Sequence, residues 1–364
     1  MTSSTRWVEA LSPWPSDGFG LARIRALLSD LGDPQRRYPS VHVVGTNGKS
    51  TTTRLTEALL SDAGLAVGAY LSPHVTGWSE RIRVRGAEVD FEHAVSAVRD
   101  AAEGRRATQF EALTAAAFVA FAEAEVDVAV VEAGLGGRYD ATNVLDTRVV
   151  VLTNVALDHM DVLGDTREAI AEEKLAVVRP GAVVVLAEPE WEEIAARNGA
   201  ARVELTARSN LALAVAAAEA FLGRPVDASA ADGVALPGRL ERRGERPLEI
   251  WDGAHNIAGV GYLLPRLPVR EYVVVGSILG DKRPAMMVEA LSVLGDTFVA
   301  TRSHNARAVP AEELGEIARP FFARVETVPD PEAARRRALE LAGPEGAVLV
   351  TGSLYLLGDL HGRR

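Results

Sequence analysis

Short apolar runs and longer helical patterns alternate along the whole chain. Several of the apolar runs are rich in valine at successive positions: residues 41–44, 126–134, 149–155, 182–188, 272–276 and 347–353. A run that is apolar on both of its faces predicts a strand buried between helices, as in a parallel sheet that is covered on each side. The pattern therefore predicts a layered α/β fold with mostly parallel sheets.

The same pattern divides the chain into two parts. Residues 209–222, SNLALAVAAAEAFL, have helical periodicity, and Gly-Arg-Pro follows them directly. The stretch after them is irregular and rich in glycine, proline and charged residues, which is typical of a boundary between domains. The chain has 364 residues, enough for two domains that each bury a core. We therefore predict domains at 1–235 and 236–364.

A glycine-rich loop, GTNGKS at 45–50, stands between a predicted strand and a predicted helix. This arrangement presents backbone N–H groups and the positive end of the helix dipole to an anion. Gly45 and Gly48 would let the backbone approach phosphate oxygens, and Lys49 would span the outer phosphates. Ser50 or Thr51 could hold Mg²⁺. The spacing is shorter than Gly-x4-Gly-Lys-Ser/Thr, so the alternative is a plain glycine turn with a lysine that faces solvent.

Three further groups of polar residues follow predicted strands. Glu132 ends the run VAVV before the glycine-rich AGLGGRYDATN. A carboxylate at the carboxyl end of a parallel strand is well placed for a ligand of an open α/β sheet, and Mg²⁺ prefers oxygen ligands. Asp158 and His159 follow a second run. The third group comprises Ser72, Pro73 and His74, with Arg81 and Arg83 nearby. Taken singly, Glu132 could equally be an ordinary surface acid, and a lone histidine could equally be a hydrogen-bonded structural residue.

Lys174 lies on the apolar face of a predicted helix, REAIAEEKLAVV, which Asp165 and Glu168 are expected to cap. Ile170 and Val177 share that face. The common explanation for a lysine on an apolar face is that its methylene groups are buried while its amine reaches water. A desolvated lysine is also more easily neutral and nucleophilic. Such an amine can take up CO₂ and become a carbamate, which is an anionic oxygen ligand for a metal.

The second half of the chain contains a crowded polar loop. Asp252, His255 and Asn256 follow the apolar run LEIW, and Arg239 lies upstream in LPGRLE. This half has no phosphate loop of its own. We therefore expect nucleotide and acceptor to bind in a cleft between the domains.

Charge and composition narrow the class of function. The net charge of −11 argues against a broad nucleic-acid-binding surface. The absence of cysteine excludes disulfides, zinc–cysteine sites and thiol catalysis. No apolar run approaches the ~20 residues of a membrane helix, and the N-terminus lacks the charged start and apolar core of a signal peptide. We expect a cytoplasmic enzyme that acts on small molecules, with no membrane or nucleic-acid partner.

Taken in order, these blocks resemble folylpolyglutamate synthase/dihydrofolate synthase, a branch of the Mur ligase superfamily. The resemblance covers nearly the whole chain: GLARIRALLSDLGDPQ, HVVGTNGKS, YLSPHVTGWSERIRVRG, FEALTAAAF, VVEAGLGGRYDATNV, LDHMDVLGDTREAIAEEKLAVVRPG, PGRLE, DGAHN, GDK and GSLYL. The SPH…ERI and GLGGRYDATN blocks are specific to the folate branch. The resemblance implies a P-loop-type, mostly parallel ATPase domain and a smaller Rossmann-like α/β C-terminal domain.

The resemblance also implies a reaction. ATP would phosphorylate a carboxylate of dihydropteroate or of a (tetrahydro)folate polyglutamate. The amine of L-glutamate would then attack the acyl phosphate, giving an amide, ADP and phosphate, so that the enzyme mainly positions groups and stabilises charge. A monomer is implied. Two alternatives stay open: a Mur-superfamily amide ligase for another acid and amino acid, and a nucleotide-binding regulatory protein that kept the fold.

Matching positions carry the roles that the resemblance implies. Catalysis would depend on Lys49, His159 and Lys174. ATP would contact Gly45, Thr46, Asn47, Gly48, Lys49, Ser50, Thr51, Arg239 and Asp252. Of two Mg²⁺ ions, one would bind Ser72 and Glu132, and the other His159 and a CO₂-derived carbamate on Lys174. The folate and glutamate substrates would contact Pro73, His74, Arg81, Phe110, Asp140, His255 and Ser353.

The chain departs from the family pattern at three places. Ser50 stands where the family usually has glycine, and Arg283 stands where an acid usually follows GDK. Between 182 and 208, a longer family insertion is mostly missing. The missing insertion bears on control of the cleft and on the length of the glutamate chain. Ser50 and the missing insertion motivate the alternative ligase function.

Overall fold

The computed structural model describes residues 3–16 and 18–362, which form two compact units. The first unit is Met1–Pro73 with Trp78–Val234, and the second is His74–Gly77 with Ala235–Arg364. The main division after Val234 lies beside the predicted boundary. The sequence pattern did not indicate that His74–Gly77 belongs with the second unit, where Val75 joins a hydrophobic cluster that contains Trp251.

The first sheet has eight strands in the order β4-β3-β2-β5-β1-β6-β7-β8. The strands are β1 (Ser40–Val44), β2 (Val67–Tyr70), β3 (Ile82–Val84), β4 (Ala87–Glu88), β5 (Val128–Glu132), β6 (Thr147–Leu152), β7 (Val183–Leu186) and β8 (Arg202–Leu205). All neighbours from β2 to β8 pair in parallel, whereas β3 and β4 add antiparallel strands at one edge. Every residue of β1, β2 and β5 is buried, which confirms the predicted sheet with two covered faces.

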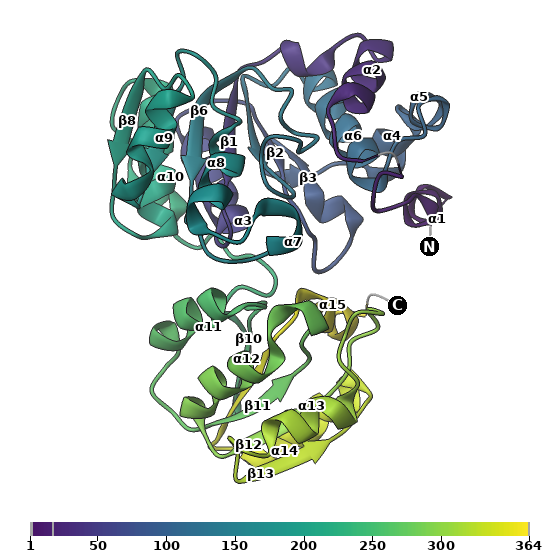
Figure 1. Ribbon diagram of the computed structural model, residues 1–364, viewed down its shortest axis with the longest axis vertical. Coiled ribbons are helices and arrows are strands. Elements are labelled where there is room, and N and C mark those ends of the chain that lie inside the picture. Colours follow the sequence, from purple (N-terminus) through teal and green to yellow (C-terminus); the bar gives the residue numbers. More distant parts are fainter. Residues whose placement is uncertain (1–2, 17, 363–364) are drawn as a thin grey trace. The chain divides into compact units, whose positions relative to one another are not determined.

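Helices cover both faces of this sheet (Figure 1). The helices of this unit are α1 (Ser3–Ala10), α2 (Ala22–Asp30), α3 (Lys49–Asp62), α4 (Phe91–Ser96), α5 (Arg99–Gly104), α6 (Gln109–Glu123), α7 (Met160–Leu163), α8 (Arg167–Leu175), α9 (Glu192–Arg197) and α10 (Asn210–Leu222). Side chains alternate between the faces of a strand. Val128 and Val130 therefore pack with α3 and α10, whereas Ala129 and Val131 pack with α6.

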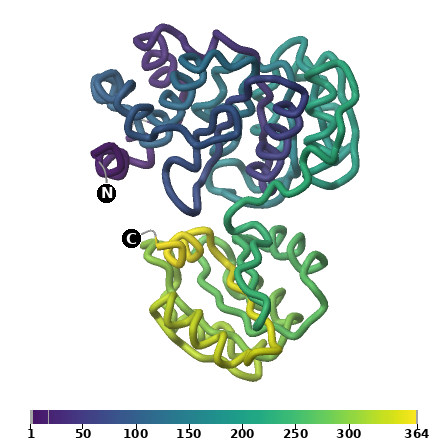
Figure 2. Tube along the Cα trace, turned by 180° about the vertical axis from the view of Figure 1, so that it is seen from behind, coloured from purple at the N-terminus to yellow at the C-terminus, as the bar shows by residue number. Residues whose placement is uncertain are grey.

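The second unit is built on a six-stranded sheet in the order β13-β12-β11-β14-β10-β9. Its elements are β9 (Glu241–Glu245), β10 (Leu248–Trp251), β11 (Tyr272–Gly276), β12 (Thr297–Ala300), β13 (Arg324–Thr327), β14 (Ala347–Thr351), α11 (Ile257–Leu263), α12 (Pro284–Leu291), α13 (Ala311–Ala318), α14 (Pro331–Ala342) and α15 (Leu354–Leu360). Only β9 is antiparallel to its neighbour. Figure 2 follows this unit from green to yellow along the chain.

The helix that contains Lys174 begins at Arg167 as predicted, but its predicted cap is wrong. Asp165 and Glu168 do not cap it. Thr166 is the N-cap of α8, and its hydroxyl oxygen accepts a hydrogen bond from the backbone N–H of Ala169 at 3.1 Å. Threonine satisfies an N-terminal N–H group in the same way as aspartate, and Thr166 already has the extended backbone of an N-cap.

The shortened region 182–208 is not an irregular loop. It forms β7, α9 and β8, and the two strands complete one edge of the first sheet. Among residues 3–16 and 18–362, no helix is both long and apolar enough to cross a membrane.

Candidate active site

The loop GTNGKS connects β1 to α3, whose first residue is Lys49. Gly48 is the N-cap with φ +82°, and Gly45 has φ +145°, so both have backbone conformations that favour glycine. A Cβ atom on Gly45 would collide with Thr153, and one on Gly48 would collide with the side chain of Asn210. The two glycines are therefore required by backbone conformation and by space, and the loop is a fixed structure rather than a loose turn.

Thr153 and Asn154, directly after β6, hold this loop in place. The backbone N–H of Thr46 donates to the Asn154 carbonyl at 3.0 Å, and that of Asn47 donates to Asn154 Oδ1 at 3.1 Å. In return, Thr153 Oγ1 and Asn154 Nδ2 donate to the Asn47 carbonyl at 2.7 and 2.9 Å. Because β6 is the parallel neighbour of β1, its end delivers these side chains to the loop.

Two lysines meet at one carbonyl of the loop. Lys49 Nζ donates to the carbonyls of Gly45 and Thr46 at 3.1 and 3.2 Å. Lys174 Nζ also donates to the Gly45 carbonyl, at 2.9 Å. Lys174 is only 3% exposed, so its amine does not reach water as the common explanation would require. Burial, and after it the charge of Lys49, lowers the pKa of Lys174 from 10.5 to about 7.

Glu132 at the end of β5 lies between two serines. Ser50 Oγ donates to Glu132 Oε1 at 3.1 Å, and the backbone N–H of Ser72 donates to Oε2 at 3.0 Å. All three residues are buried. One carboxylate and two hydroxyl groups fit Mg²⁺, which prefers oxygen ligands and keeps several waters. In the described part of the chain, no group of three or more His, Asp or Glu side chains could hold a metal, so any ion here would also need water or substrate oxygens.

His159 and Asp158 lie in the loop that leads from β6 to α7. His159 is the N-cap of α7 with φ +50°, a conformation that is uncommon for a side chain other than glycine. Its Nε2 lies 3.9 Å from Asp158 Oδ1. The charge of Asp158 opposes the lowering of the Lys174 pKa. This electrostatic interaction shows that the loop lies near the buried amine.

The carboxylate of Asp140 is hydrogen-bonded within its own loop. Its carboxylate accepts hydrogen bonds from the backbone N–H groups of Leu135 and Thr142 at 2.8 and 3.0 Å. The Thr142 hydroxyl also donates to it, and His42 Nε2 lies 2.8 Å from that hydroxyl. Burial raises the pKa of Asp140 and lowers that of His42 to about 3. The observed contacts of Asp140 therefore give it a structural task, which is to close the loop after β5.

The other predicted substrate residues of this part of the chain lie around β2 and α6. The ring of Phe110 lies over Gly134, where a Cβ atom would collide with it, and its centroid is 6.0 Å from that of Tyr70. Arg81 is buried with its guanidinium 4.9 Å from the centre of the Trp78 ring. Pro73 follows Ser72 through a cis peptide bond. His74 is buried and is assigned to the second unit.

In the second unit, Asp252 organises the loop after β10. It accepts hydrogen bonds from the backbone N–H groups of Leu240 and Ala254, both at 2.9 Å. Burial raises the pKa of Asp252, and the charge of Arg239 lowers it. The two residues predicted to contact nucleotide therefore lie together. His255 Nδ1 donates to the Gly253 carbonyl at 2.8 Å.

Two polar residues that follow strands β10 and β14 in the second unit are helix caps. Asn256 Oδ1 accepts from the backbone N–H of Gly259 at 2.7 Å at the start of α11. Ser353 Oγ accepts from Tyr355 N at 3.1 Å at the start of α15. Each side chain thus has a structural task whether or not it also contacts a substrate.

The sequence interpretation missed three residues of the loop's surroundings: Thr153, Asn154 and Asn210. Thr153 and Asn154 stand in the same post-strand position as Glu132, which is a signal that could have drawn attention to them. Asn210 is the first residue of α10, and no local pattern connects it with Gly48.

Comparisons with known proteins show the family to which the chain belongs. The Mur ligase middle domain matches residues 43–220, and the Mur ligase, glutamate ligase domain matches residues 238–354. The chain is 31% identical to the dihydrofolate synthase/folylpolyglutamate synthase of Bacillus subtilis over 94% of each chain. The chain belongs to this family of Mur ligases.

Solved structures of the family have the same fold. Mycobacterium tuberculosis folylpolyglutamate synthase complexed with ADP is 31% identical with a TM-score of 0.89, over 99% of this chain and 98% of that one. The bifunctional folylpolyglutamate synthase/dihydrofolate synthase of Yersinia pestis, complexed with AMPPNP and Mn ion, is 30% identical with a TM-score of 0.89, over 100% and 98%. The fold class and the family resemblance predicted from the sequence are confirmed, and this chain, as a family member, is a ligase.

Proposed function

We propose that this ligase joins L-glutamate to dihydropteroate, to folate polyglutamates, or to both, with ATP as co-substrate. The γ-phosphoryl group of ATP is transferred to a carboxylate oxygen of the acceptor, and ADP leaves. The glutamate amine attacks the carbonyl carbon of the acyl phosphate, loses a proton, and displaces phosphate. The observation that carries this proposal is the rigid phosphate loop with Lys49 and Lys174 at the Gly45 carbonyl, in a chain of this family.

The residues of the loop act by binding and by charge. The backbone N–H groups at the start of α3 and the Lys49 ammonium hold the phosphates of ATP. Thr153 and Asn154 keep the loop in the binding conformation, so little reorganisation is needed when ATP arrives. The reaction requires no protein nucleophile, which agrees with a chain that lacks cysteine.

We assign two Mg²⁺ positions to this site. Ser72 and Glu132 would hold the first, with Ser50 orienting the carboxylate. His159 and Lys174 would hold the second, with Lys174 as a carbamate. A buried amine with a pKa of about 7 is neutral in a large fraction of molecules at neutral pH, and only the neutral form combines with CO₂, releasing one proton. When bound, the ions would neutralise charge on the transferring phosphoryl group.

The remaining assignments follow the family pattern. Pro73, His74, Arg81, Phe110 and Asp140 contribute to folate binding, the last by shaping its loop. Arg239 and Asp252 contact the nucleotide, and His255 and Ser353 contact glutamate. We infer a monomeric, cytoplasmic enzyme.

An assay of ADP release tests the proposed function. The purified protein is incubated with ATP, Mg²⁺ and L-glutamate, together with dihydropteroate or with tetrahydrofolate, and the products are separated by glutamate-chain length. We expect glutamate-dependent ADP release with at least one pteridine and a product that is longer by one or more glutamyl units. If the protein binds ATP but turns over neither pteridine, the acceptor is a different acid and the proposal is wrong.

A further inference from the structure

Glu188 is a buried carboxylate that belongs to none of the proposed metal, phosphate or substrate positions. It is 4% exposed and lies two residues beyond the end of β7. This strand is the parallel neighbour of β6, whose end carries Thr153 and Asn154. An ionised carboxylate is costly to bury unless charged groups and hydrogen-bond donors compensate it. The partners of Glu188 therefore indicate its task.

Four donors occupy the two carboxylate oxygens of Glu188. The backbone N–H of Val155 donates to Oε2 at 2.9 Å, and Trp191 Nε1 donates to the same oxygen at 2.8 Å. Arg167 donates to Oε1 at 3.3 Å, and Arg208 donates to it as well. A carboxylate has about four acceptor positions. Because these positions are filled, Glu188 does not serve as a ligand for a metal or a substrate, and it acts through its partners.

The backbone of Val155 is held at both its N–H and its carbonyl. The N–H donates to Glu188, and the carbonyl accepts a hydrogen bond from Arg167 Nε at 3.1 Å. Arg167 is the first residue of α8, the helix that carries Lys174. Since Arg167 also donates to Glu188, the three residues form a closed cycle of hydrogen bonds. This cycle fixes the position of the backbone at Val155.

The residues on either side of Val155 hold the phosphate loop. Before it, Asn154 accepts hydrogen bonds from the backbone N–H groups of Thr46 and Asn47 at 3.0 and 3.1 Å. After it, the N–H of Ala156 donates to Thr46 Oγ1 at 3.1 Å. This segment is thus bonded both to the phosphate loop and, through Val155, to the buried carboxylate.

We propose that Glu188 is a positioning residue for nucleotide binding. Through Val155, it holds segment 153–156 in the position in which this segment fixes the phosphate loop. The proposal rests on the proposed function, in which the loop binds the phosphates of ATP. A loop that already has the binding conformation loses less conformational freedom when the nucleotide arrives. The shortened region 182–208 therefore contributes to the ATP side of the reaction.

Binding of ADP with Mg²⁺, measured by calorimetry without an acceptor, tests this role. Glu188→Ala should bind ADP about tenfold more weakly, the effect of losing one charge-assisted hydrogen bond. Glu188→Gln should recover most of the affinity, because its amide oxygen can still accept from Val155 while Arg167 and Arg208 turn toward water. In turnover, Glu188→Ala should raise the KM for ATP and leave the KM for L-glutamate nearly unchanged.

Hydrogen exchange reports directly on the contact between the segment and the loop. The amides of Thr46 and Asn47 are bonded to Asn154, so their exchange becomes faster when this contact opens. Mass spectrometry of the peptide that covers 45–50 should show faster exchange in Glu188→Ala than in the wild type. A variant that is merely less stable would instead exchange faster throughout the first unit.

Two arginines offer a matched pair of variants. Arg167→Gln and Arg208→Gln remove the same charge from Glu188, but of the two side chains Arg167 is the one that contacts Val155. The side chains of Arg167 and Arg208 are 40% and 68% exposed, so both variants should fold even if Glu188→Ala does not. Arg167→Gln should weaken ADP binding about fivefold, and Arg208→Gln by at most about twofold.

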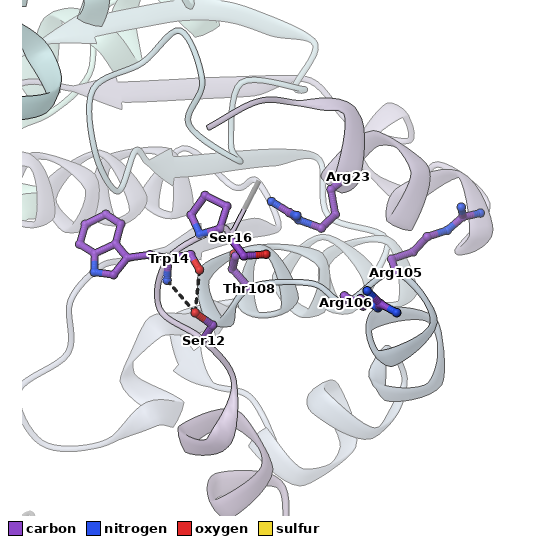
Figure 3. Close-up of a pocket in the computed structure, with 8 residues that line it drawn as sticks. Ser12, Trp14, Ser16, Arg23, Arg105, Arg106 and Thr108 are labelled. Atoms are coloured by element: carbon purple, nitrogen blue, oxygen red, sulfur yellow. Dashed lines mark hydrogen bonds between the residues drawn. The ribbon is translucent and has the colours of Figure 1, made fainter. Parts of the chain in front are cut away.

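Arg105 provides a control outside this network. It donates to both oxygens of Asp30 at 2.6 and 2.7 Å, and Figure 3 shows it at a pocket of about 260 Å³ elsewhere in the first unit. The residues that line this pocket are Ser12, Trp14, Pro15, Ser16, Arg23, Arg105, Arg106 and Thr108. They share no member with the phosphate loop or with segment 153–156. Arg105→Gln should therefore bind ADP like the wild type.

Three outcomes would overturn the proposal: wild-type ADP affinity in a folded Glu188→Ala, equal weakening by Arg167→Gln and Arg208→Gln, or faster exchange spread evenly over the first unit. The ADP-binding experiment does not involve ligation. A protein that binds ADP but turns over neither pteridine rejects the proposed acceptor and leaves the role of Glu188 intact. Wild-type ADP binding by the variants of a protein that does ligate glutamate rejects only the role of Glu188.

Discussion

Replacing Lys174 by methionine should stabilise the protein while it abolishes ligation. Lys174 is buried, and its pKa falls from 10.5 to about 7, chiefly because burial disfavours the charged amine. That shift of about 3.5 units corresponds to roughly 5 kcal/mol. Methionine has a similar length and no charge. It leaves the Gly45 carbonyl without one donor, and this loss reduces the stabilisation by about 1 kcal/mol. The expected gain in the free energy of unfolding at pH 7 is therefore about 4 kcal/mol.

The stabilisation by Lys174→Met should decrease as the pH rises. The folded-state pKa of Lys174 lies below the unfolded one, so the folded protein binds fewer protons over the interval between them. The cost of Lys174 is fully present below about pH 7 and disappears as the pH rises toward 10.5. At pH 9.5, the pH is about one unit below the unfolded-state pKa of 10.5. The destabilisation that remains is therefore roughly 1 kcal/mol. The stabilisation by methionine should then nearly vanish.

Urea unfolding of the wild type and Lys174→Met at both pH values measures this, in CO₂-free buffer so that the amine stays free. Lys49→Met is the matched control. Lys49 is only partly buried, so its removal relieves the smaller, coulombic part of the interaction and should change stability less. A gain that is equal at pH 7 and pH 9.5, or a loss of stability at pH 7, would refute the assignment of a buried amine that is costly to charge.

Other variants test the remaining roles. Lys49→Ala should abolish ADP release with an unchanged circular dichroism spectrum, and near-normal turnover would reject its phosphate role. Lys174→Ala should be partly rescued by added short carboxylic acids in bicarbonate-free buffer, since these can replace a carbamate, whereas no rescue in protein that still binds ATP would argue against the carbamate. Ser50→Ala should raise the Mg²⁺ concentration for half-maximal activity by about fivefold, because Glu132 loses a hydrogen bond of about 1 kcal/mol. Ser50→Thr, which keeps the hydroxyl, is its control, and an equal Mg²⁺ requirement in Ser50→Ala would contradict this role.

The parts of the fold that could be predicted are those with local causes. A strand buried on both faces must be apolar at successive positions, and the valine runs of β5, β6, β11 and β14 meet that condition. The phosphate loop was visible for a similar reason. Gly45 and Gly48 have backbone conformations that favour glycine, so the residue type itself indicates the conformation of the loop.

The parts that could not be predicted depend on contacts between distant segments. Thr153 and Asn154 bind the phosphate loop only because β6 is the parallel neighbour of β1. Asn210 reaches Gly48 only because α10 packs beside α3 on the same face of the sheet. The post-strand position of Thr153 and Asn154 marks them as candidates but does not name the loop that they bind, and Asn210 has no local pattern of this kind.

Ser50 shows how such a contact changes a functional interpretation. From the sequence, its hydroxyl was a candidate ligand of Mg²⁺, and the family resemblance placed Ser50 among the ATP contacts. In the structure, it donates to Glu132, which lies 82 positions away along the chain. The parallel pairing of β1 with β5 places Val43 opposite Glu132, so the carboxylate emerges beside the first turn of α3. Glycine at this position has no hydroxyl to offer, and Glu132 would then depend on Ser72 and on water for its orientation. The departure from the family pattern thus acts on Glu132, the carboxylate that we propose as a metal ligand.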